Sequence, residues 1–171
     1  MPRYVALLRG VNVGGRMTPM ADVRALFAEL GHTDVRTYIQ SGNVVFTTAR
    51  GQPASLRAAI ERALASAFGF DIPTLLRTAT DLAKTVQANP FGPTAYVTFL
   101  DGAPDHRRVA TLDASAFEPD EFAVKGAEVF LRCPNGYGRT KLNNTFFERR
   151  LATGATTRNW KTVTTLLDWV R

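Results

Sequence analysis

The chain has 171 residues, of which 45% are hydrophobic and 21% are charged. This composition is that of an ordinary globular protein, and it excludes an intrinsically disordered chain. The single cysteine, Cys133, excludes an internal disulfide and fits a reducing compartment. The apolar stretch from Tyr4 to Leu8 is too short for a signal peptide or a membrane span. We therefore expect a cytoplasmic protein that does not associate with membranes.

The first half of the sequence predicts two strand–helix–strand units in succession. Proline at a helix start and glycine just beyond a helix end mark two amphipathic helices, and runs of β-branched residues mark the strands. Thr18 is expected to cap the first helix, with Pro19 at its first position. In chain order, the expected elements are a strand at 3–9, a helix at 18–30, strands at 35–40 and 43–48, a helix at 53–68 and a strand at 72–78.

The second half repeats most of this order, but a helix is expected to replace its last strand. The two strands of its hairpin surround Lys125-Gly126-Ala127, a tight-turn pattern. The expected elements are a helix at 80–88, a strand at 94–100, a helix at 104–112, strands at 121–126 and 128–133, and helices at 141–151 and 160–170.

These orders predict an α+β fold of two tandem ferredoxin-like halves, residues 1–78 and 79–171, the second of which ends in helices. The first strand is apolar on both faces, whereas the two helices of one half cover only one face of its sheet. The other half or the extra helices must cover the second face. No linker rich in Ser, Gly or Pro occurs at 79–93. We therefore expect one compact body.

Four segments together resemble the bacterial family called domain of unknown function 1697. They are LLRGVNVGGRM at 7–17, YIQSGNVVF at 38–46, RTKLNNTFFE at 139–148 and ATTRNWKTV at 155–163. The combination is specific, and the resemblance covers essentially the whole chain. It implies a two-part α+β fold and no established activity, and it carries over no catalytic residue.

The loop GVNVGGR at 10–16 lies between a strand and a helix, where glycine-rich loops bind phosphate on exposed N–H groups. Its glycine spacing fits neither a P-loop nor a dinucleotide-binding loop. One interpretation is an anion site. The alternative is a turn in which Gly14 and Gly15 adopt positive φ and Asn12 caps the loop. The Ser41-Gly42 hairpin turn is expected at the end of the sheet where the fourth strand starts, and not beside this loop.

Two further segments, RTKLNN at 139–144 and TTRNWK at 156–161, place arginine, lysine and asparagine at helix starts. Cations are unfavourable beside the positive end of a helix dipole, and an anionic ligand would resolve that conflict. The alternative is that Asn144 and Asn159 cap the helices and the cations are solvated. The candidate ligand-binding residues are Arg9, Asn12, Gly14, Gly15, Arg16, Arg139, Lys141, Asn144, Arg158, Asn159 and Lys161.

The sequence carries no recognisable catalytic signature. Its two histidines, His32 and His106, stand in no motif and are expected at the surface. With Cys133 they make no metal-ligand set, since zinc takes three or four ligands at short spacings. We predict no cofactor and no metal, and we favour a non-enzyme whose catalytic residues, if any, are unknown.

The net charge is +6. Most of the excess of positive charge lies after Cys133, in a segment with seven basic and two acidic residues. The first hypothesis is a binding protein for a phosphate-bearing or other anionic ligand. The second is non-specific nucleic-acid binding through this C-terminal basic segment. A structural or partner-binding domain is a third possibility. The sequence does not determine the oligomeric state.

Overall fold

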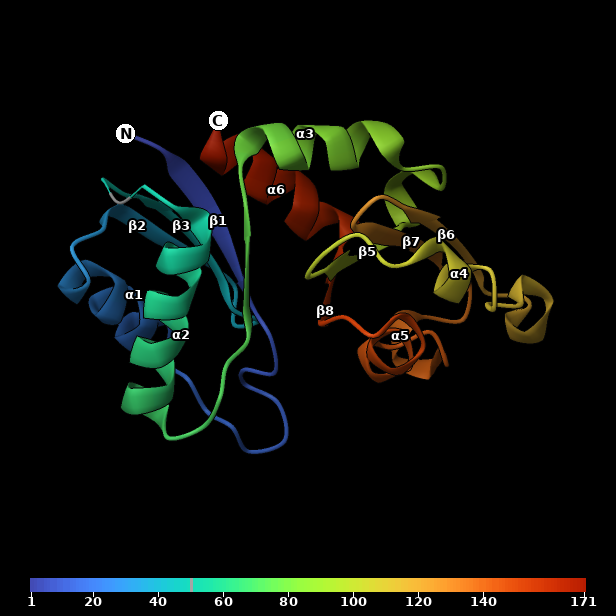
Figure 1. The fold of residues 1–171 in the computed structure, drawn as a ribbon, viewed down its shortest axis with the longest axis horizontal. Coiled ribbons are helices and arrows are strands. Elements are labelled where there is room, and N and C mark those ends of the chain that lie inside the picture. The colour runs from blue at the N-terminus through green and yellow to red at the C-terminus, as the bar shows by residue number, and fades with distance from the viewer. Residues whose placement is uncertain (50) are drawn as a thin grey trace. The chain divides into compact units, whose positions relative to one another are not determined.

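The computed structural model describes residues 1–49 and 51–171 and shows an α+β protein with two four-stranded antiparallel sheets (Figure 1). The chain forms two compact units. The first comprises Met1–Ala83 and Thr165–Arg171, and the second comprises Lys84–Thr164. Each unit contains one of the sheets.

The first unit holds the sheet with strand order β2-β3-β1-β4, in which all neighbours are antiparallel. Val5, in the middle of β1, pairs with Val45 on one side and with Arg77 on the other. This central position explains why β1 is apolar on both faces. The elements are β1 (Arg3–Leu8), α1 (Met20–Glu29), β2 (Thr33–Tyr38), β3 (Asn43–Thr47), α2 (Pro53–Phe68) and β4 (Thr74–Arg77), in the predicted order.

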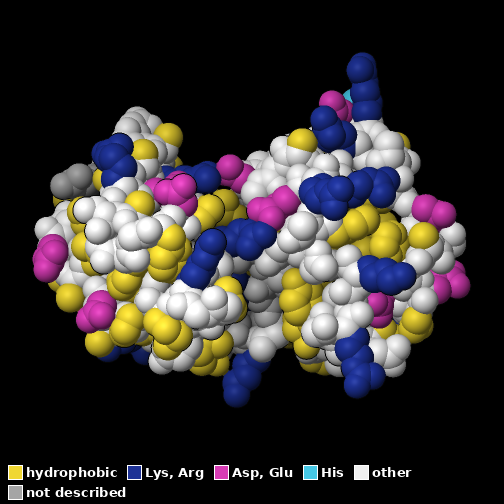
Figure 2. Space-filling model, turned by 90° about the horizontal axis from the view of Figure 1, so that it is seen from below, with side chains coloured by type: hydrophobic (Ala, Val, Ile, Leu, Met, Phe, Trp, Pro, Cys, Tyr) yellow, Lys and Arg dark blue, Asp and Glu magenta, His cyan; other side chains and the backbone are white. Residues whose placement is uncertain are grey.

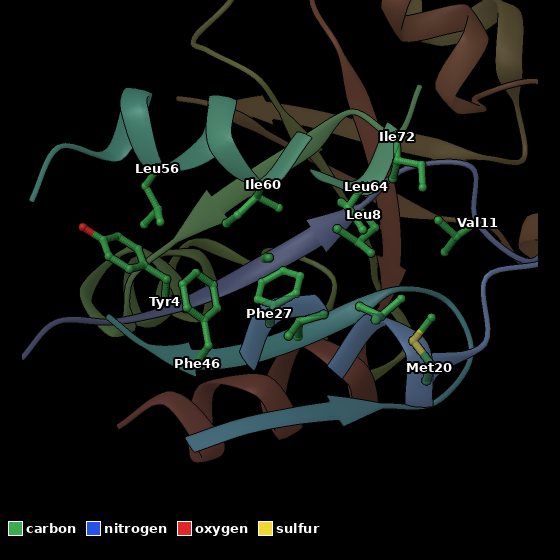
Figure 3. Close-up of a cluster of buried hydrophobic side chains, with 13 residues drawn as sticks. Tyr4, Leu8, Val11, Met20, Phe27, Phe46, Leu56, Ile60, Leu64 and Ile72 are labelled. Atoms are coloured by element: carbon green, nitrogen blue, oxygen red, sulfur yellow. The ribbon is translucent and has the colours of Figure 1, made fainter. Parts of the chain in front are cut away.

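Helices α1 and α2 cover one face of this sheet and form a core with it (Figure 3). Phe27 of α1 meets Phe46 of β3 edge to face, with ring centroids 5.1 Å apart. His32 lies in the same aromatic cluster, its ring centroid 4.8 Å from that of Phe46, and only 5% of its surface is exposed. The surface position predicted for His32 is therefore wrong, because the turn after Gly31 directs the side chain back into the core.

The last turns of α6 (Trp160–Val170) lie against the other face of the first sheet. The guanidinium of Arg36 stacks 3.7 Å from the ring centroid of Trp169, and Tyr38 contacts the same indole edge to face at 5.4 Å. Arg3 Nη1 donates a 2.9 Å hydrogen bond to the carbonyl of Arg171. A helix from the end of the chain thus supplies part of the cover that β1 requires.

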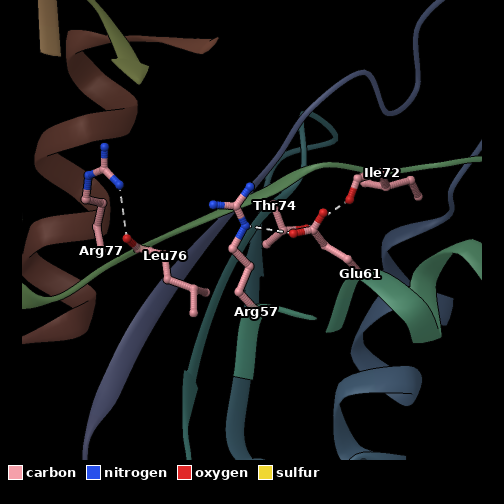
Figure 4. A network of polar contacts seen from close by, with 6 residues as sticks. All are labelled: Arg57, Glu61, Ile72, Thr74, Leu76 and Arg77. Atoms are coloured by element: carbon pink, nitrogen blue, oxygen red, sulfur yellow. Dashed lines mark hydrogen bonds and ion pairs between the residues drawn. The ribbon is translucent and has the colours of Figure 1, made fainter. Parts of the chain in front are cut away.

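Polar groups around β4 are satisfied locally (Figure 4). On α2, Arg57 Nε pairs with Glu61 Oε1 at 2.7 Å, one helical turn away. The hydroxyl of buried Thr74 donates to the carbonyl of Ile72 at 3.1 Å. Arg77 Nη1 donates to the carbonyl of Leu76 at 3.1 Å. These side chains stabilise the strand end and the neighbouring helix, so they are explained by the fold.

The second unit holds a sheet with strand order β6-β7-β5-β8, again antiparallel throughout. Helix α3 (Ala79–Ala88) runs from the first unit into the second. The further elements are β5 (Tyr96–Leu100), α4 (His106–Val109), β6 (Glu121–Lys125), β7 (Glu128–Arg132), α5 (Asn144–Leu151) and β8 (Ala155–Asn159). Short 3₁₀ helices at Ala114–Phe117 and Tyr137–Arg139 interrupt the connections.

Strand β8 corrects the prediction that a helix replaces the last strand of the second half. It pairs with β5 along its whole length, with Arg158 opposite Val97. Two features hide it in the sequence. Threonine, a good strand former, stands on both of its faces, so no apolar–polar alternation appears. Asn159 ends the strand and Trp160 begins α6 at once, which leaves no turn signal between them.

Several predicted helix starts shift for physical reasons. Thr18 does not cap α1, because Pro19 holds the cap position and both the N–H and the hydroxyl of Thr18 donate to Asn12 Oδ1, at 2.8 and 3.4 Å. Helix α5 begins at Asn144 rather than at 141. Helix α4 has only four residues, since Asp105 caps its start and a 3₁₀ helix follows. No helix among the described residues is long and apolar enough to cross a membrane.

Candidate functional site

The glycine loop of the first unit is a tight turn braced by Asn12. Val13 and Arg16 form a β-bridge, and between them Gly14 and Gly15 take φ values of 56° and 83°. Positive φ at both central residues is the requirement of a type I′ turn, which glycine meets without strain. The Asn12 amide donates to the carbonyls of Thr18 at 3.2 Å and Gln40 at 2.6 Å. The backbone and Asn12 thus have the roles that the turn interpretation predicts.

The β2–β3 turn lies beside this loop, which corrects the predicted separation of the two. Antiparallel pairing places the start of β3 next to the end of β1, so Leu8 N–H donates to Gly42 O at 2.8 Å. The contact is close. A Cβ on Gly42 would lie 2.7 Å from a Val11 methyl and 2.8 Å from Leu8 Cβ. Glycine is required there both by this approach and by its φ of 84°.

The surface of these two loops is apolar as well as basic. Val13, Met17 and Ile39 are exposed to 59%, 68% and 51%. Arg16 lies over the ring of Phe70, 5.2 Å from its centroid. Arg9 is half-buried, and its N–H donates to Pro73 O at 2.9 Å. The two loops thus carry exposed apolar side chains beside their two arginines.

In the second unit, Arg158 is buried in the sheet rather than offered to a ligand. Only 7% of the residue is exposed. Its Nη1 donates to Thr156 Oγ1 at 2.7 Å and to the Thr157 carbonyl at 3.0 Å. Burial lowers the pKa of Arg158 to about 10, and the charge of the Tyr137 phenol opposes that change. Arg158 therefore serves the packing of β8, and its predicted role in anion pairing finds no support in this geometry.

The asparagines of the two basic segments also have internal partners. Asn159 Oδ1 accepts from Thr162 N–H at 2.8 Å and so caps α6, as the capping alternative predicts. The cap of α5 is Asn143, whose Oδ1 accepts from Phe146 N–H at 2.9 Å. Asn144 lies inside the helix and accepts from the Thr157 hydroxyl at 2.7 Å. Its predicted role as a cap is wrong by one residue.

Arg139 and Lys141, two of the predicted residues, line one pocket. The pocket has a volume of about 260 Å³ and lies between two loops of the second unit. One wall is residues 116–120, which include the end of the 3₁₀ helix Ala114–Phe117 and the loop before β6. The other wall is formed by residues of the segment 135–141, between β7 and α5. Both cations are exposed. Neither side chain makes an ion pair or hydrogen bond with any residue that the structure describes.

The opposite wall of this pocket carries two carboxylates, Glu118 and Asp120. Asp120 is held in place, because the Thr140 hydroxyl donates to its Oδ2 at 2.7 Å and its own N–H donates to Phe117 O at 2.8 Å. Thr140 stands between Arg139 and Lys141, so this single hydrogen bond ties the two walls together. Acids and bases thus face one pocket within the described chain without closing an ion pair across it.

Cys133 is buried next to Thr140 and Asp120 and is shielded from solvent. It is 9% exposed and carries a free thiol. Burial raises the pKa of the Cys133 thiol, a hydrogen bond with Thr140 lowers it, and the charge of Asp120 raises it again. A thiol with a raised pKa is a poor nucleophile. The cysteine is best understood as a core residue.

A larger, shallower hollow adjoins the pocket on the other side of Glu118 and Asp120, with a volume of about 890 Å³. Arg132, which lines it, already pairs with Glu121 at 2.9 Å. The difference between the two hollows is therefore electrostatic. The cations of the smaller hollow have no acidic partner among the described residues, whereas Arg132 of the larger one pairs with a carboxylate.

The described residues contain no group of three or more His, Cys, Asp or Glu side chains that could hold a metal ion. His106 is exposed and lies 3.8 Å from its neighbour Asp105. Lys161 is exposed at the start of α6. Sequence reasoning missed Glu118, Asp120 and Asn135 as pocket residues. The acidic run 118–121 and the turn residues 134–136 were the available signals, but neither shows that the two segments face each other.

The fold and this pocket define a two-unit α+β protein without a catalytic signature among its described residues. Over residues 1–130 the chain matches the model of a family described as "Protein of unknown function (DUF1697)", and it belongs to that family. The family predicted from the sequence is thereby confirmed, and two of the four segments that carried the resemblance, 7–17 and 38–46, lie within the matched residues.

The structure is also similar to that of the conserved bacterial protein SP0830 from Streptococcus pneumoniae. The TM-score is 0.79 at 24% sequence identity, over 99% of this chain and 98% of that chain. This likeness shows that the two proteins share a fold. No curated protein matches the chain.

Proposed function

We propose that the protein binds a small anionic ligand in the pocket of the second unit, with Arg139 and Lys141 as its charge partners. The observation that carries the proposal is that both cations line one pocket and make no ion pair among the described residues. Arginine offers a planar pair of donors that suits a phosphate or carboxylate, and lysine adds a compact positive charge.

The size of the pocket restricts the ligand. At about 260 Å³ it lies just below the range of roughly 300–1,000 Å³ that is typical for drug-sized molecules. A phosphorylated or carboxylated metabolite of a few heavy atoms fits this volume, whereas a nucleic-acid backbone needs an extended basic groove. Lys and Arg side chains on the face shown in Figure 2 are dispersed among acidic and apolar ones. The pocket therefore favours a small ligand over nucleic acid.

Calorimetric titration with inorganic phosphate at low salt tests the proposal. We expect saturable binding that weakens about tenfold or more in Arg139→Gln/Lys141→Gln, because each charge-assisted hydrogen bond contributes roughly 1.5–3 kcal/mol. The matched control is Arg149→Gln, an exposed cation outside the pocket. If phosphate does not bind at millimolar concentration, or if the control variant weakens binding equally, the proposed site is wrong.

We also infer that each sheet with its helices is a ferredoxin-like half. Both sheets have the same order when their strands are numbered along the chain, with the first strand central between the third and fourth. Both follow the sequence strand, helix, strand, strand, helix, strand once β8 is included. These two correspondences support a duplicated architecture.

A further inference from the structure

The pocket that holds the two cations is electrically balanced, which an anion alone does not explain. Glu118 and Asp120 line it together with Arg139 and Lys141. A phosphate placed beside the cations would therefore also meet two negative side chains, and like charges at short range oppose binding. A site selected for a simple anion would gain by losing those carboxylates.

Nor are Glu118 and Asp120 present as ion-pair partners of Arg139 and Lys141 within the described residues. Where this unit closes an ion pair, as between Arg132 and Glu121, the nitrogen and oxygen approach to 2.9 Å. No such pair forms across the smaller pocket within the described residues, although both signs of charge line it. The two groups face a common space instead of neutralising each other directly.

The position of Asp120 is fixed by the protein. It is half-buried, and Thr140 donates to its Oδ2 at 2.7 Å. The same threonine hydroxyl accepts from Leu142 N–H at 3.1 Å, which orients it toward Asp120. A carboxylate held this way has its second oxygen, Oδ1, available to a ligand. The pocket thus presents a preorganised acceptor on one wall and flexible cations on the other.

We propose that the ligand is a zwitterion, a small molecule with a phosphate or carboxylate at one end and an ammonium group at the other. The anionic end pairs with Arg139 and Lys141, and the ammonium group donates to Asp120 and Glu118. This inference rests on the proposed function and specifies its ligand class. Both pairs of side chains then gain a partner of opposite charge, which neither pair has among the described residues.

Phosphoethanolamine, propyl phosphate and propylamine test this inference. The first two have the same length and differ in having an ammonium or a methyl group at one end, whereas propylamine keeps the ammonium group and lacks the phosphate. We expect phosphoethanolamine to bind about tenfold or more tightly than propyl phosphate, the ratio that one charge-assisted hydrogen bond supplies. In Glu118→Gln the advantage of phosphoethanolamine should shrink by a similar factor, while propyl phosphate binds equally or more tightly. Glu118 is exposed, so this change leaves the fold intact.

Asp120→Asn gives a second reading of the same effect, because the amide keeps an oxygen for Thr140. Glu121→Gln is the matched control, since Glu121 lines the larger hollow and not this pocket. Equal affinity for phosphoethanolamine and propyl phosphate would overturn the zwitterion inference and leave the anion site standing. If propylamine binds and neither phosphate compound does, both proposals fail.

Discussion

Arg158 illustrates how little a single residue's chemistry says about its role. In the sequence it is one of a run of cations beside an asparagine, and an anion site is a natural interpretation. In the structure the guanidinium lies within the sheet and donates to Thr156 and to the backbone of β8. The same stretch holds exposed Lys161 at the helix start. The two cations differ because Arg158 lies on strand β8, which the sequence does not reveal, whereas Lys161 lies on the first turn of α6.

Replacement of Arg158 by methionine is expected to raise the free energy of unfolding by about 1 kcal/mol, because burial disfavours the charged form and an apolar side chain of similar length avoids that cost. Since the pKa of Arg158 is lowered to about 10, the unfolded chain binds more protons than the folded one only above that pH. The increase in the free energy of unfolding caused by Arg158→Met should therefore be the same at pH 6 and pH 8. Urea denaturation at the two pH values measures this increase.

The matched control is Arg149→Met, on the exposed side of α5. Its unfolding free energy should change by less than about 0.5 kcal/mol, as for most surface substitutions. A fall of more than about 1 kcal/mol in Arg158→Met, with the control unchanged, would mean that the hydrogen bonds of Arg158 outweigh its burial cost.

At the scale of elements, the sequence predicts long amphipathic helices and apolar strands well and short polar elements poorly. Helix α2 runs over the predicted residues because proline, an apolar stripe and glycine agree on its bounds. Strand β8 is not predicted from the sequence because its buried residues include Thr156 and Arg158, which are polar. The start of α5 is ambiguous because two asparagines stand in succession, and either can cap a helix.

Alanine and glycine substitutions at those two asparagines should have opposite rankings. At Asn143, the cap, alanine should lower the free energy of unfolding by about 1 kcal/mol and glycine by only a few tenths, since glycine tolerates the cap conformation. At Asn144, inside the helix, glycine should cost roughly 0.5–1 kcal/mol more than alanine. Thermal or urea unfolding of the four variants checks the reversal. The same ranking at both positions would contradict the assigned helix start.

At the scale of the whole molecule, local sequence signals do not predict which segments meet. The pocket joins residues 116–120 to residues 135–141 across an intervening hairpin, and the four charges on its walls come from both. The Thr140–Asp120 hydrogen bond joins those walls, and it has no signature in the local sequence. The candidate site was therefore half predictable. Its cations follow from their clustering in the sequence, whereas its acids emerge only from the fold.

The path of the chain has a related consequence for stability. The chain builds the first unit, builds the second, and returns so that Thr165–Arg171 completes the first. Within that returning segment, Trp169 stacks on Arg36 at 3.7 Å and contacts Tyr38. Residues more than 130 positions apart in the sequence thus stabilise one sheet through a cation–π and an aromatic contact.

Trp169→Ala should therefore weaken the two units unequally. Loss of the indole removes half-buried apolar area and the stacking of Arg36, which together are expected to cost about 2 kcal/mol. Amide hydrogen exchange of β1 and β3 should accelerate about 30-fold, while that of β5 and β7 changes little. Trp160→Ala, at the other end of the same helix and in the second unit, is the matched control and should leave β1 and β3 protected. Equal acceleration in both sheets would show instead that the units unfold together and that the returning helix belongs to neither alone.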